Sequence, residues 1–285
     1  MTEQEKLMYE ILGQITTSDI PIVFKGGLIT KLILNESGLS SVQRTTKDID
    51  ANWIGQPPSM DYLVDSLNNS FGDLQRCYKA VASRQYGEKQ SAGISVIDKN
   101  TGRKFITMDI DIKPLIDSKT YYYEQTKIRG VLPDEILADK ICVLSGEAIY
   151  KSRAKDVLDV FLLSKCVEVY SKDISDICKR AGREIKSFDA FHNKEAEIEH
   201  AYNKLKGIEG KPDFNTVYNY LYEFVVPFAQ EVIPNKMWDC KSLSWNDVCK
   251  TKSPLSRKQI NQNAKIISHK QENQPQHNKD KSKSR

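Results

Sequence analysis

The sequence predicts an α+β fold in which a mixed sheet with helices precedes a helical C-terminal lobe. Strand and helix patterns alternate through about the first 130 residues, and helical periodicity dominates after the proline at position 133. A third stretch, from about residue 250, is rich in Lys, Gln, Asn and Ser and contains no Phe, Tyr or Trp. We therefore expect a mixed core at 1–132, a helical lobe at 133–250 and a basic, largely disordered tail at 251–285.

The bulk composition excludes several classes of protein. The 285 residues are 39% hydrophobic and 28% charged, which is enough apolar material for a sizeable core. No stretch approaches the roughly 18 uncharged apolar residues of a membrane-spanning helix, and the first residues do not resemble a signal peptide. The six cysteines form no CxxC pair and no zinc-finger pattern. We expect reduced thiols, a cytoplasmic location and no membrane partner.

The net charge of +4 is unevenly distributed along the chain. Residues 1–249 carry 32 Lys and Arg against 36 Asp and Glu, a net of −4, whereas residues 250–285 carry 10 against 2, a net of +8. The tail is predicted to be a solubilising terminus, and the alternative is an arm that contacts nucleic acid. A second basic cluster, Lys151, Arg153 and Lys155, is either solvated surface or a guide for RNA.

The first elements are predicted to be a helix, a strand and a second helix. Apolar residues at helical spacing predict an amphipathic helix over 5–15, and the β-branched run at 20–24 predicts a strand. Lys-Gly-Gly at 25–27 follows that strand directly, and 28–34 is again apolar on one helical face. The order strand, glycine turn, helix offers free backbone amides to a phosphate, although the glycines could equally make only a tight turn.

The remaining elements follow from the same two periodicities. Alternation predicts a strand over 44–54, helical spacing predicts a helix over 60–71, and the runs 92–97 and 104–112 flank a polar turn and predict a β-hairpin. A last strand is expected over 121–128. Apolar residues then recur every three or four positions and predict helices over 134–148, 155–166, 173–183, 194–206 and 213–230. Aromatic residues in the last helix could stack on bases, but their spacing favours packing in the core.

Carboxylates recur on the predicted strands. Asp48 and Asp50 are two residues apart in one strand, so their side chains share a face roughly 7 Å apart and can bind the same divalent cations. Asp109 and Asp111 alternate with apolar residues on the second hairpin strand, which can bring a third carboxylate to that face. Each pair alone is explained by a solvated polar face, but their combination with the glycine turn favours a catalytic site.

This set of groups suits nucleotidyl transfer. The reaction moves an α-phosphoryl group in line from pyrophosphate to an acceptor oxygen, and two Mg²⁺ ions stabilise the entering and leaving oxygens. Carboxylates are the ligands that such hard cations prefer, and Mn²⁺ is an alternative ion. A third carboxylate can also help to remove the proton of the acceptor.

Four motifs together resemble the AbiEii-type nucleotidyltransferase toxins, which include the MenT enzymes, within the polymerase-β-like nucleotidyltransferase superfamily. They are Lys25-Gly26-Gly27, Arg44-x-Thr46-x-Asp48-Ile49-Asp50, Asp139-Lys140 and Lys155-Asp156-x-x-Asp159. The family's pattern is a GG turn, an R-x-S/T-x-D-I-D strand, a third acidic strand, an A-E/D-K helix and a K-D-x-x-D helix. The match runs over residues 23–163. It departs from the pattern in a long spacing before the first carboxylate and in the aspartate that precedes the motif lysine, and both changes are conservative.

The resemblance implies where a nucleotide would bind. Gly26 and Gly27, together with Lys25, would cradle the triphosphate. Arg44 and Thr46 would orient the carboxylate strand or touch phosphate. Gly26, Gly27, Arg44 and Thr46 match the family's motif positions, and Lys25 directly precedes the glycine pair.

It also implies which carboxylates would bind metal. Asp48 and Asp50 would bind Mg²⁺. For the third metal ligand the fit to the family's strand favours Asp109 narrowly over Asp111.

The two helical motifs carry the last implied site residues. Lys140 would face the nucleotide phosphates and Asp156 would lie near the catalytic centre. Asp159 could simply pair on the same helix face. Without the family, Lys140 could be an ordinary exposed helix lysine.

The activity that the resemblance implies is Mg²⁺-dependent transfer of a nucleoside monophosphate from an NTP to an acceptor hydroxyl, such as the 3′ end of tRNA. The biological role would be that of a growth-inhibiting toxin or phage-defence component controlled by a partner antitoxin. Two alternatives stay open: transfer to a protein side chain (NMPylation), and a catalytically silent nucleotide- or RNA-binding regulator.

Overall fold

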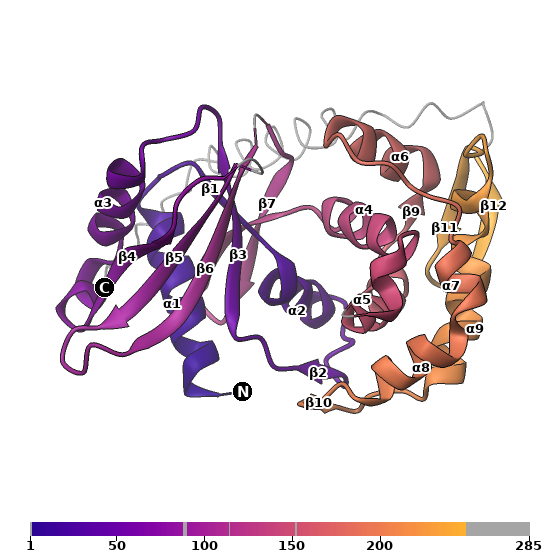
Figure 1. Cartoon of the computed structure of the whole chain (residues 1–285), viewed down its shortest axis with the longest axis horizontal. Coiled ribbons are helices and arrows are strands. Elements are labelled where there is room, and N and C mark those ends of the chain that lie inside the picture. Colours follow the sequence, from indigo (N-terminus) through magenta and orange to yellow (C-terminus); the bar gives the residue numbers. More distant parts are fainter. Residues whose placement is uncertain (1, 88–89, 114, 152, 249–285) are drawn as a thin grey trace, which may run out of the picture. The chain divides into compact units, whose positions relative to one another are not determined.

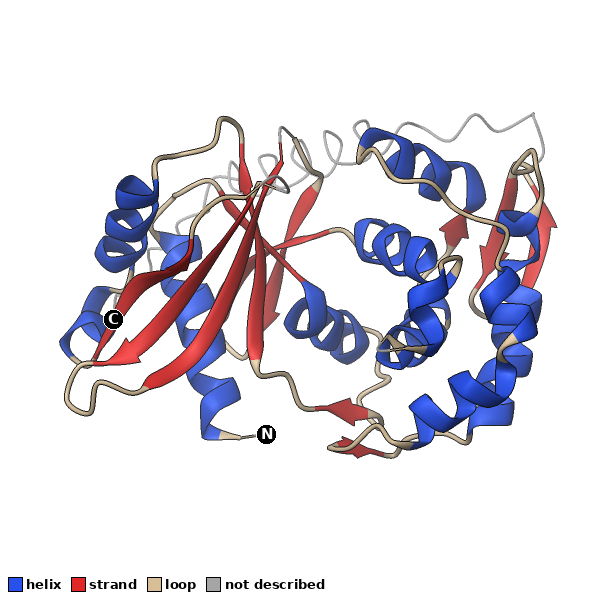
Figure 2. Ribbon diagram, viewed as in Figure 1, coloured by secondary structure: helices blue, strands red, loops and turns tan. Residues whose placement is uncertain are grey.

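The computed structural model describes residues 2–87, 90–113, 115–151 and 153–248, without the side chains of residues 43 and 44. The chain divides into a compact unit, Met1–Asn246, and a second unit, Asp247–Arg285. Only residues 247 and 248 of the second unit are described, so the predicted basic tail at 251–285 lies outside the described residues. Figures 1 and 2 show the elements of the compact unit.

A seven-stranded mixed sheet forms the N-terminal part of the compact unit (Figure 2). Its strands are β1 (Ile22–Lys25), β3 (Asp48–Ile54), β4 (Tyr78–Arg84), β5 (Ser91–Asp98), β6 (Lys104–Lys113), β7 (Ser118–Tyr123) and β8 (Thr126–Val131). Their order across the sheet is β4-β5-β6-β3-β1-β8-β7. β3 pairs antiparallel with β1 and parallel with β6, and β1 pairs parallel with β8. The central position of β3 and β6 brings their side chains next to one another.

Alternation gives the central strands one apolar and one polar face. On β3 and β6 the apolar residues Ile49, Ala51, Met108 and Ile110 are fully buried in the core. The acidic residues between them project to the opposite face. The same pleat that builds the core therefore collects the carboxylates on one surface.

Three helices pack against this sheet: α1 (Glu3–Thr17), α2 (Gly26–Glu36) and α3 (Met60–Ser70). α1 begins with a capping box, in which the side chains of Thr2 and Glu5 each accept a hydrogen bond from the other's backbone amide. It lies against β8, β1 and β6, whereas α2 lies against β1, β3 and β7. The start of α2 is thereby held beside β3.

Helices dominate after β8, and α4 packs against α5 and α6 (Figure 1). They are α4 (Pro133–Leu144), α5 (Ala154–Ser164), α6 (Ser171–Arg180), α7 (Asp189–Asn193), α8 (Glu195–Asn203) and α9 (Phe214–Val225), with short 3₁₀ segments η1 (Gly72–Arg76), η2 (Glu147–Tyr150) and η3 (Val226–Ala229). Val217, Leu221 and Phe224 of α9 are buried, which confirms that its apolar residues pack in the core. Within the described part of the chain, no helix combines the length and the apolar character needed to cross a membrane.

The structure confirms the α+β class and the hairpin, which β5 and β6 form by antiparallel pairing. The single strand predicted over 121–128 is wrong, because a turn at Glu124, with φ of 52°, divides the region into β7 and β8. The strand predicted over 44–54 divides into β2 (Gln43–Arg44), which pairs with β10 (Ile208–Glu209), and β3. β4 was not predicted, since Ala80 is its only buried residue and the expected alternation is missing.

The C-terminal part is less purely helical than predicted. It contains a three-stranded sheet in the order β12-β11-β9, formed by β9 (Val169–Tyr170), β11 (Lys236–Asp239) and β12 (Ser244–Asp247). The large sheet ends with β8 and the helices begin with α4, next to the predicted boundary at 132, but the division into separate lobes stays a prediction. The described cysteines are free thiols, as predicted.

Candidate active site

Three carboxylates lie on the polar face of the sheet, on neighbouring positions of two strands. Asp48 and Asp50 alternate with buried residues along β3, and the parallel pairing of β3 with β6 sets Asp50 directly beside Asp109. Residues paired in this way project to the same face. We call Asp48, Asp50 and Asp109 the carboxylate cluster. Asp111 is one alternation further along β6, beside Asn52 rather than beside Asp50.

The glycine turn, Gly26 and Gly27, is tighter than expected, because these residues are already the first two of α2. Gly26 has a φ of +69°, and a Cβ built there would lie 2.0 Å from Oδ2 of Asp50. A side chain would therefore collide with the carboxylate cluster and strain the backbone. The absence of a side chain lets the start of α2, with its free amides, approach Asp50 closely.

Lys25 separates the two candidates for the third metal ligand. Its Nζ lies 2.5 Å from Oδ2 of Asp111. Burial would raise the pKa of Asp111, but the ion pair with Lys25 outweighs it and the pKa lies below its ordinary value. Asp109 instead contacts the half-exposed Arg84 at 2.9 Å. Both carboxylates are thus ion-paired, and Asp109 differs from Asp111 in its position beside Asp50.

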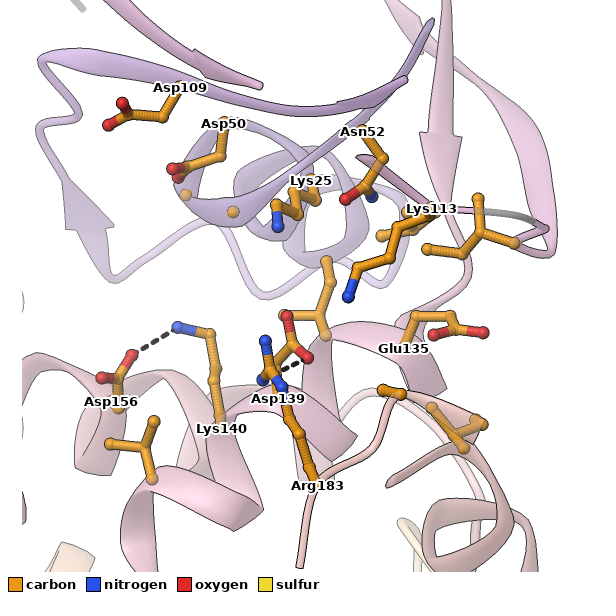
Figure 3. A pocket seen from close by; sticks show the side chains of 18 of the residues that line it. Lys25, Asp50, Asn52, Asp109, Lys113, Glu135, Asp139, Lys140, Asp156 and Arg183 are labelled. Carbon is orange, nitrogen blue, oxygen red and sulfur yellow. Dashed lines mark hydrogen bonds and ion pairs between the residues drawn. The ribbon is translucent and has the colours of Figure 1, made fainter. Parts of the chain in front are cut away.

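A cavity of about 630 Å³ opens between the carboxylate cluster and helices α4, α5 and α6 (Figure 3). The predicted site residues that line it are Lys25, Gly26, Gly27, Thr46, Asp48, Asp50, Asp109, Lys140 and Asp156. Asp111 is outside this lining, and the side chain of Arg44 lies outside the described residues. Residues predicted from four separate motifs therefore surround a single cavity.

Lys140 is not the exposed lysine that one interpretation predicted. Its side chain is buried, and its Nζ lies 2.7 Å from Asp156 and 2.6 Å from Asp159. Burial alone would lower the pKa of Lys140, but the two carboxylates outweigh it and raise the pKa. Arg153 adds a second cation, with Nε 2.7 Å from Oδ2 of Asp156. Asp159 therefore pairs with Lys140 of the neighbouring helix α4.

The basic cluster predicted at 151–155 is divided between two hollows. Arg153 and Lys155 line the large cavity, whereas Lys151 lines a separate hollow with His200. The charge of Lys155 acts on Asp50, whose pKa it lowers against stronger opposing effects. Two of the three cations therefore belong to the candidate site.

The carboxylate cluster has the donor chemistry for a hard cation. Among the described residues, no three His, Cys, Asp or Glu side chains already converge as a metal cage. Burial raises the pKa of Asp50, and the neighbouring charges of Asp48 and Asp109 raise it further. A divalent cation bound to these oxygens would relieve that repulsion, so the residues fit such an ion.

Sequence reasoning missed the far end of the cavity. Asn52 continues the alternation of Asp48 and Asp50 on β3 and lines the cavity, so its position could have been read from the strand pattern. Two ion pairs there join α4 to the end of α6 and to the segment that follows it: Arg180 lies 3.5 Å from Glu135, and Arg183 lies 2.5 Å from Asp139. Burial raises the pKa of Glu135 to about 7, although Arg180 opposes the shift.

Comparisons with known proteins were made for sequence and for structure. The family described as the nucleotidyl transferase AbiEii toxin of type IV toxin–antitoxin systems matches residues 10–219. No curated protein matches the sequence.

Solved structures with a detectable likeness include an antigenic nucleotidyltransferase-like protein from Paracoccidioides brasiliensis, with 14% identity, a TM-score of 0.43, and coverage of 70% of this chain and 92% of that chain. The toxin MenT4 from Mycobacterium tuberculosis H37Rv has 14% identity and a TM-score of 0.36. The match covers 70% of this chain but only 62% of MenT4. ANT(2″)-Ia, in complex with adenylyl-2″-tobramycin, has 14% identity and a TM-score of 0.41, with coverage of 64% and 97%.

The sequence match extends beyond the motifs at both ends, from α1 into α9. It includes the glycine turn, the carboxylate cluster and the helices that carry Lys140 and Asp156. Because it spans most of the chain, the protein belongs to the AbiEii family of nucleotidyltransferase toxins.

Proposed function

We propose that the protein transfers a nucleoside monophosphate from an NTP to an acceptor hydroxyl, with Mg²⁺ as the cation and Mn²⁺ as an alternative. The observation that carries the proposal is the position of the carboxylate cluster beside the glycine turn, on one wall of a single cavity. A triphosphate held by the turn would have its reacting phosphorus next to the carboxylates. This placement is what in-line phosphoryl transfer requires.

Each group has a task in the proposed reaction. The amides of the glycine turn would hold the triphosphate, and Asp109 would take the acceptor's proton as the new O–P bond forms and the bond to pyrophosphate breaks. Mg²⁺ held by the carboxylate cluster would stabilise charge on the entering and leaving oxygens. Lys140, which Asp156 and Asp159 hold in place, would add positive charge near the nucleotide phosphates.

Thr46 and Arg44 complete the proposed nucleotide site. Thr46 is 5% exposed, lines the cavity, and its Oγ1 has no hydrogen-bond partner among the described residues. A phosphate oxygen would satisfy that hydroxyl. The role of Arg44 rests on the sequence motif alone.

The acceptor and the biological role are proposed from the family. We place the activity in the cytoplasm, with the 3′ end of tRNA as the acceptor, and in a toxin or phage-defence role that a partner antitoxin controls. The toxin–antitoxin description of the family supports this role. Arg153 and Lys155 in the cavity wall supply cations that an RNA end could contact.

The test is a transfer assay. Purified protein is incubated with Mg²⁺, total RNA and each α-labelled NTP in turn, alongside Asp48→Asn and the control Asp61→Asn, which changes an exposed aspartate of α3. We expect labelled RNA from the wild type and the control, and none from Asp48→Asn. Label on protein alone would replace RNA with a protein acceptor. No label with any NTP, or equal labelling by Asp48→Asn, would refute the proposed activity.

A further inference from the structure

Asn52 presents a buried amide that none of the described residues satisfies. It is 1% exposed, and neither its Nδ2 nor its Oδ1 has a hydrogen-bond partner within the described ranges. Buried amides are almost always paired, because leaving their polar atoms bare destabilises the fold. The side chain lines the same cavity as the carboxylate cluster (Figure 3). An amide that is kept buried and bare in a binding cavity points to a ligand.

We propose that Asn52 binds the base of the nucleoside triphosphate and sets the choice of base, an inference that rests on the proposed function. Asn52 follows Asp50 by one alternation of β3, so the two side chains share a face roughly 7 Å apart. The base of a nucleotide lies one sugar ring away from the α-phosphate. With that phosphate at the carboxylate cluster, the base reaches the part of the cavity that Asn52 lines.

The chemistry of the amide selects a base rather than a phosphate. Asn52 offers one acceptor and one NH₂ donor side by side. A phosphate offers only acceptors and would leave Oδ1 bare. The edge of a base carries a donor next to an acceptor, and an asparagine can bond both at once, as it does when it reads adenine. A base edge therefore satisfies both atoms of Asn52 with one ligand.

The neighbours of Asn52 leave it free to act in this way. Asp111 pairs with Asn52 in the strand register, and its carboxylate is a natural acceptor for the Asn52 amide. Lys25 binds that carboxylate at 2.5 Å instead. The ion pair thus occupies the carboxylate that is paired with Asn52 in the strand register, and it leaves Asn52 to the cavity.

The cavity that Asn52 lines also has walls suited to a flat ring. Ile116, Ile136 and Val143 contribute apolar side chains, and Leu115 adds one that is 73% exposed. Apolar contacts of this kind suit the two faces of a base, while the few polar groups fix its orientation. Figure 3 shows Glu135 on the helix side, facing the sheet that carries Asn52.

The test compares affinities for nucleotides with and without a base. Equilibrium competition is measured for ATP, CTP, GTP, UTP and ribose 5′-triphosphate, using wild type, Asn52→Leu, Asn52→Asp and the control Asn219→Leu, which changes an exposed residue of α9. Wild type and control should bind one NTP at least about 10-fold more tightly than ribose triphosphate. Asn52→Leu should lose the choice among bases and bind the four NTPs with nearly equal affinity, closer to that of ribose triphosphate.

Two further measurements, the melting temperature of Asn52→Leu and the base preference of Asn52→Asp, separate loss of the amide from loss of the fold. Asn52→Leu replaces an unsatisfied amide with an apolar group of similar size, so its melting temperature without ligand should equal or exceed that of the wild type. Asn52→Asp keeps the shape and loses the NH₂ donor, so it should lose the base preference as well. Unchanged base preference in both variants overturns the inference. Equal binding of all five ligands by the wild type overturns it too, because the triphosphate then binds without any contribution from the base. Binding of none of the five would refute the proposed function instead.

Discussion

Replacing Lys140 tests whether the buried ion network holds the candidate site together. In Lys140→Met the ammonium is removed while most of the apolar stem is kept. Asp156 and Asp159 would then lose a cation at 2.7 and 2.6 Å, and their side chains are only 1% and 3% exposed. Removing one partner of a buried pair destabilises a protein by about 3–5 kcal/mol, because the other charge is left uncompensated. Arg153 still neutralises Asp156, so we expect about 3 kcal/mol.

The assay is urea unfolding without nucleotide at pH 7, with the loss read from the shift in midpoint at a constant slope. In the variant the uncompensated carboxylates have raised pKa values in the folded state, so the deficit should shrink as the pH falls towards 5 and they become protonated. Adding Asp159→Asn should recover part of the lost stability, since it removes one of the stranded charges. Lys6→Met is the control, because Lys6 pairs with Glu3 on an exposed helix surface and such pairs contribute little.

A loss below about 1 kcal/mol, the range of surface pairs, would refute the reasoning. So would a deficit that does not change with pH. Either result would mean that Lys140 is not held by buried carboxylates, and its proposed place near the phosphates would lose its support.

Three further predictions concern the cavity. Gly26→Ala should lower the free energy of unfolding by about 1–2 kcal/mol because of the positive φ, and further because the new Cβ collides with Asp50. It should also abolish labelled transfer. Gly38→Ala is the control: Gly38 has a similar φ of +74°, but a Cβ there meets nothing within 4 Å, so this variant should stay active. Asp50→Asn should raise the melting temperature while abolishing transfer, because it removes a partly buried charge that Asp48 and Asp109 repel. Glu135 has a pKa of about 7 against 4.5 when unfolded, so wild-type stability should fall as the pH rises between these values, and Glu135→Gln should flatten that part of the curve of melting temperature against pH. Transfer by Gly26→Ala, a lower melting temperature for Asp50→Asn, or an unchanged pH curve for Glu135→Gln would contradict the respective argument.

The sequence was sufficient where a local pattern decides the structure. Alternation along 104–112 identified β6, and the spacing of Asp48 and Asp50 placed both carboxylates on one face. It failed where no local pattern exists. The turn at Glu124 carries no glycine or proline to mark it, so one strand was predicted in place of two. β4 exposes most of its residues and so lacks the signal of a half-buried strand.

The site shows the same division. The motif lysine and aspartates could be named from the sequence, but the contacts of Lys140 depend on how α4 packs against α5, which no spacing along the chain encodes. From the sequence, Asp159 was therefore interpreted as a residue that could pair along its own helix. Asn52 belongs to no motif, and its proposed role rests on packing that buries it without a hydrogen-bond partner among the described residues.

The parallel pairing of β3 with β6 has a consequence for when the enzyme can act. Parallel neighbours need a crossover, and here α3, β4 and β5 intervene between Asp50 and Asp109. Contacts so distant along the chain form late, after the intervening segment has folded. During synthesis the third carboxylate cannot join the other two until this segment has left the ribosome, and Lys140 and Asp156 follow later still. A nascent or truncated chain is thus expected to lack the proposed transfer activity, which needs most of the compact unit.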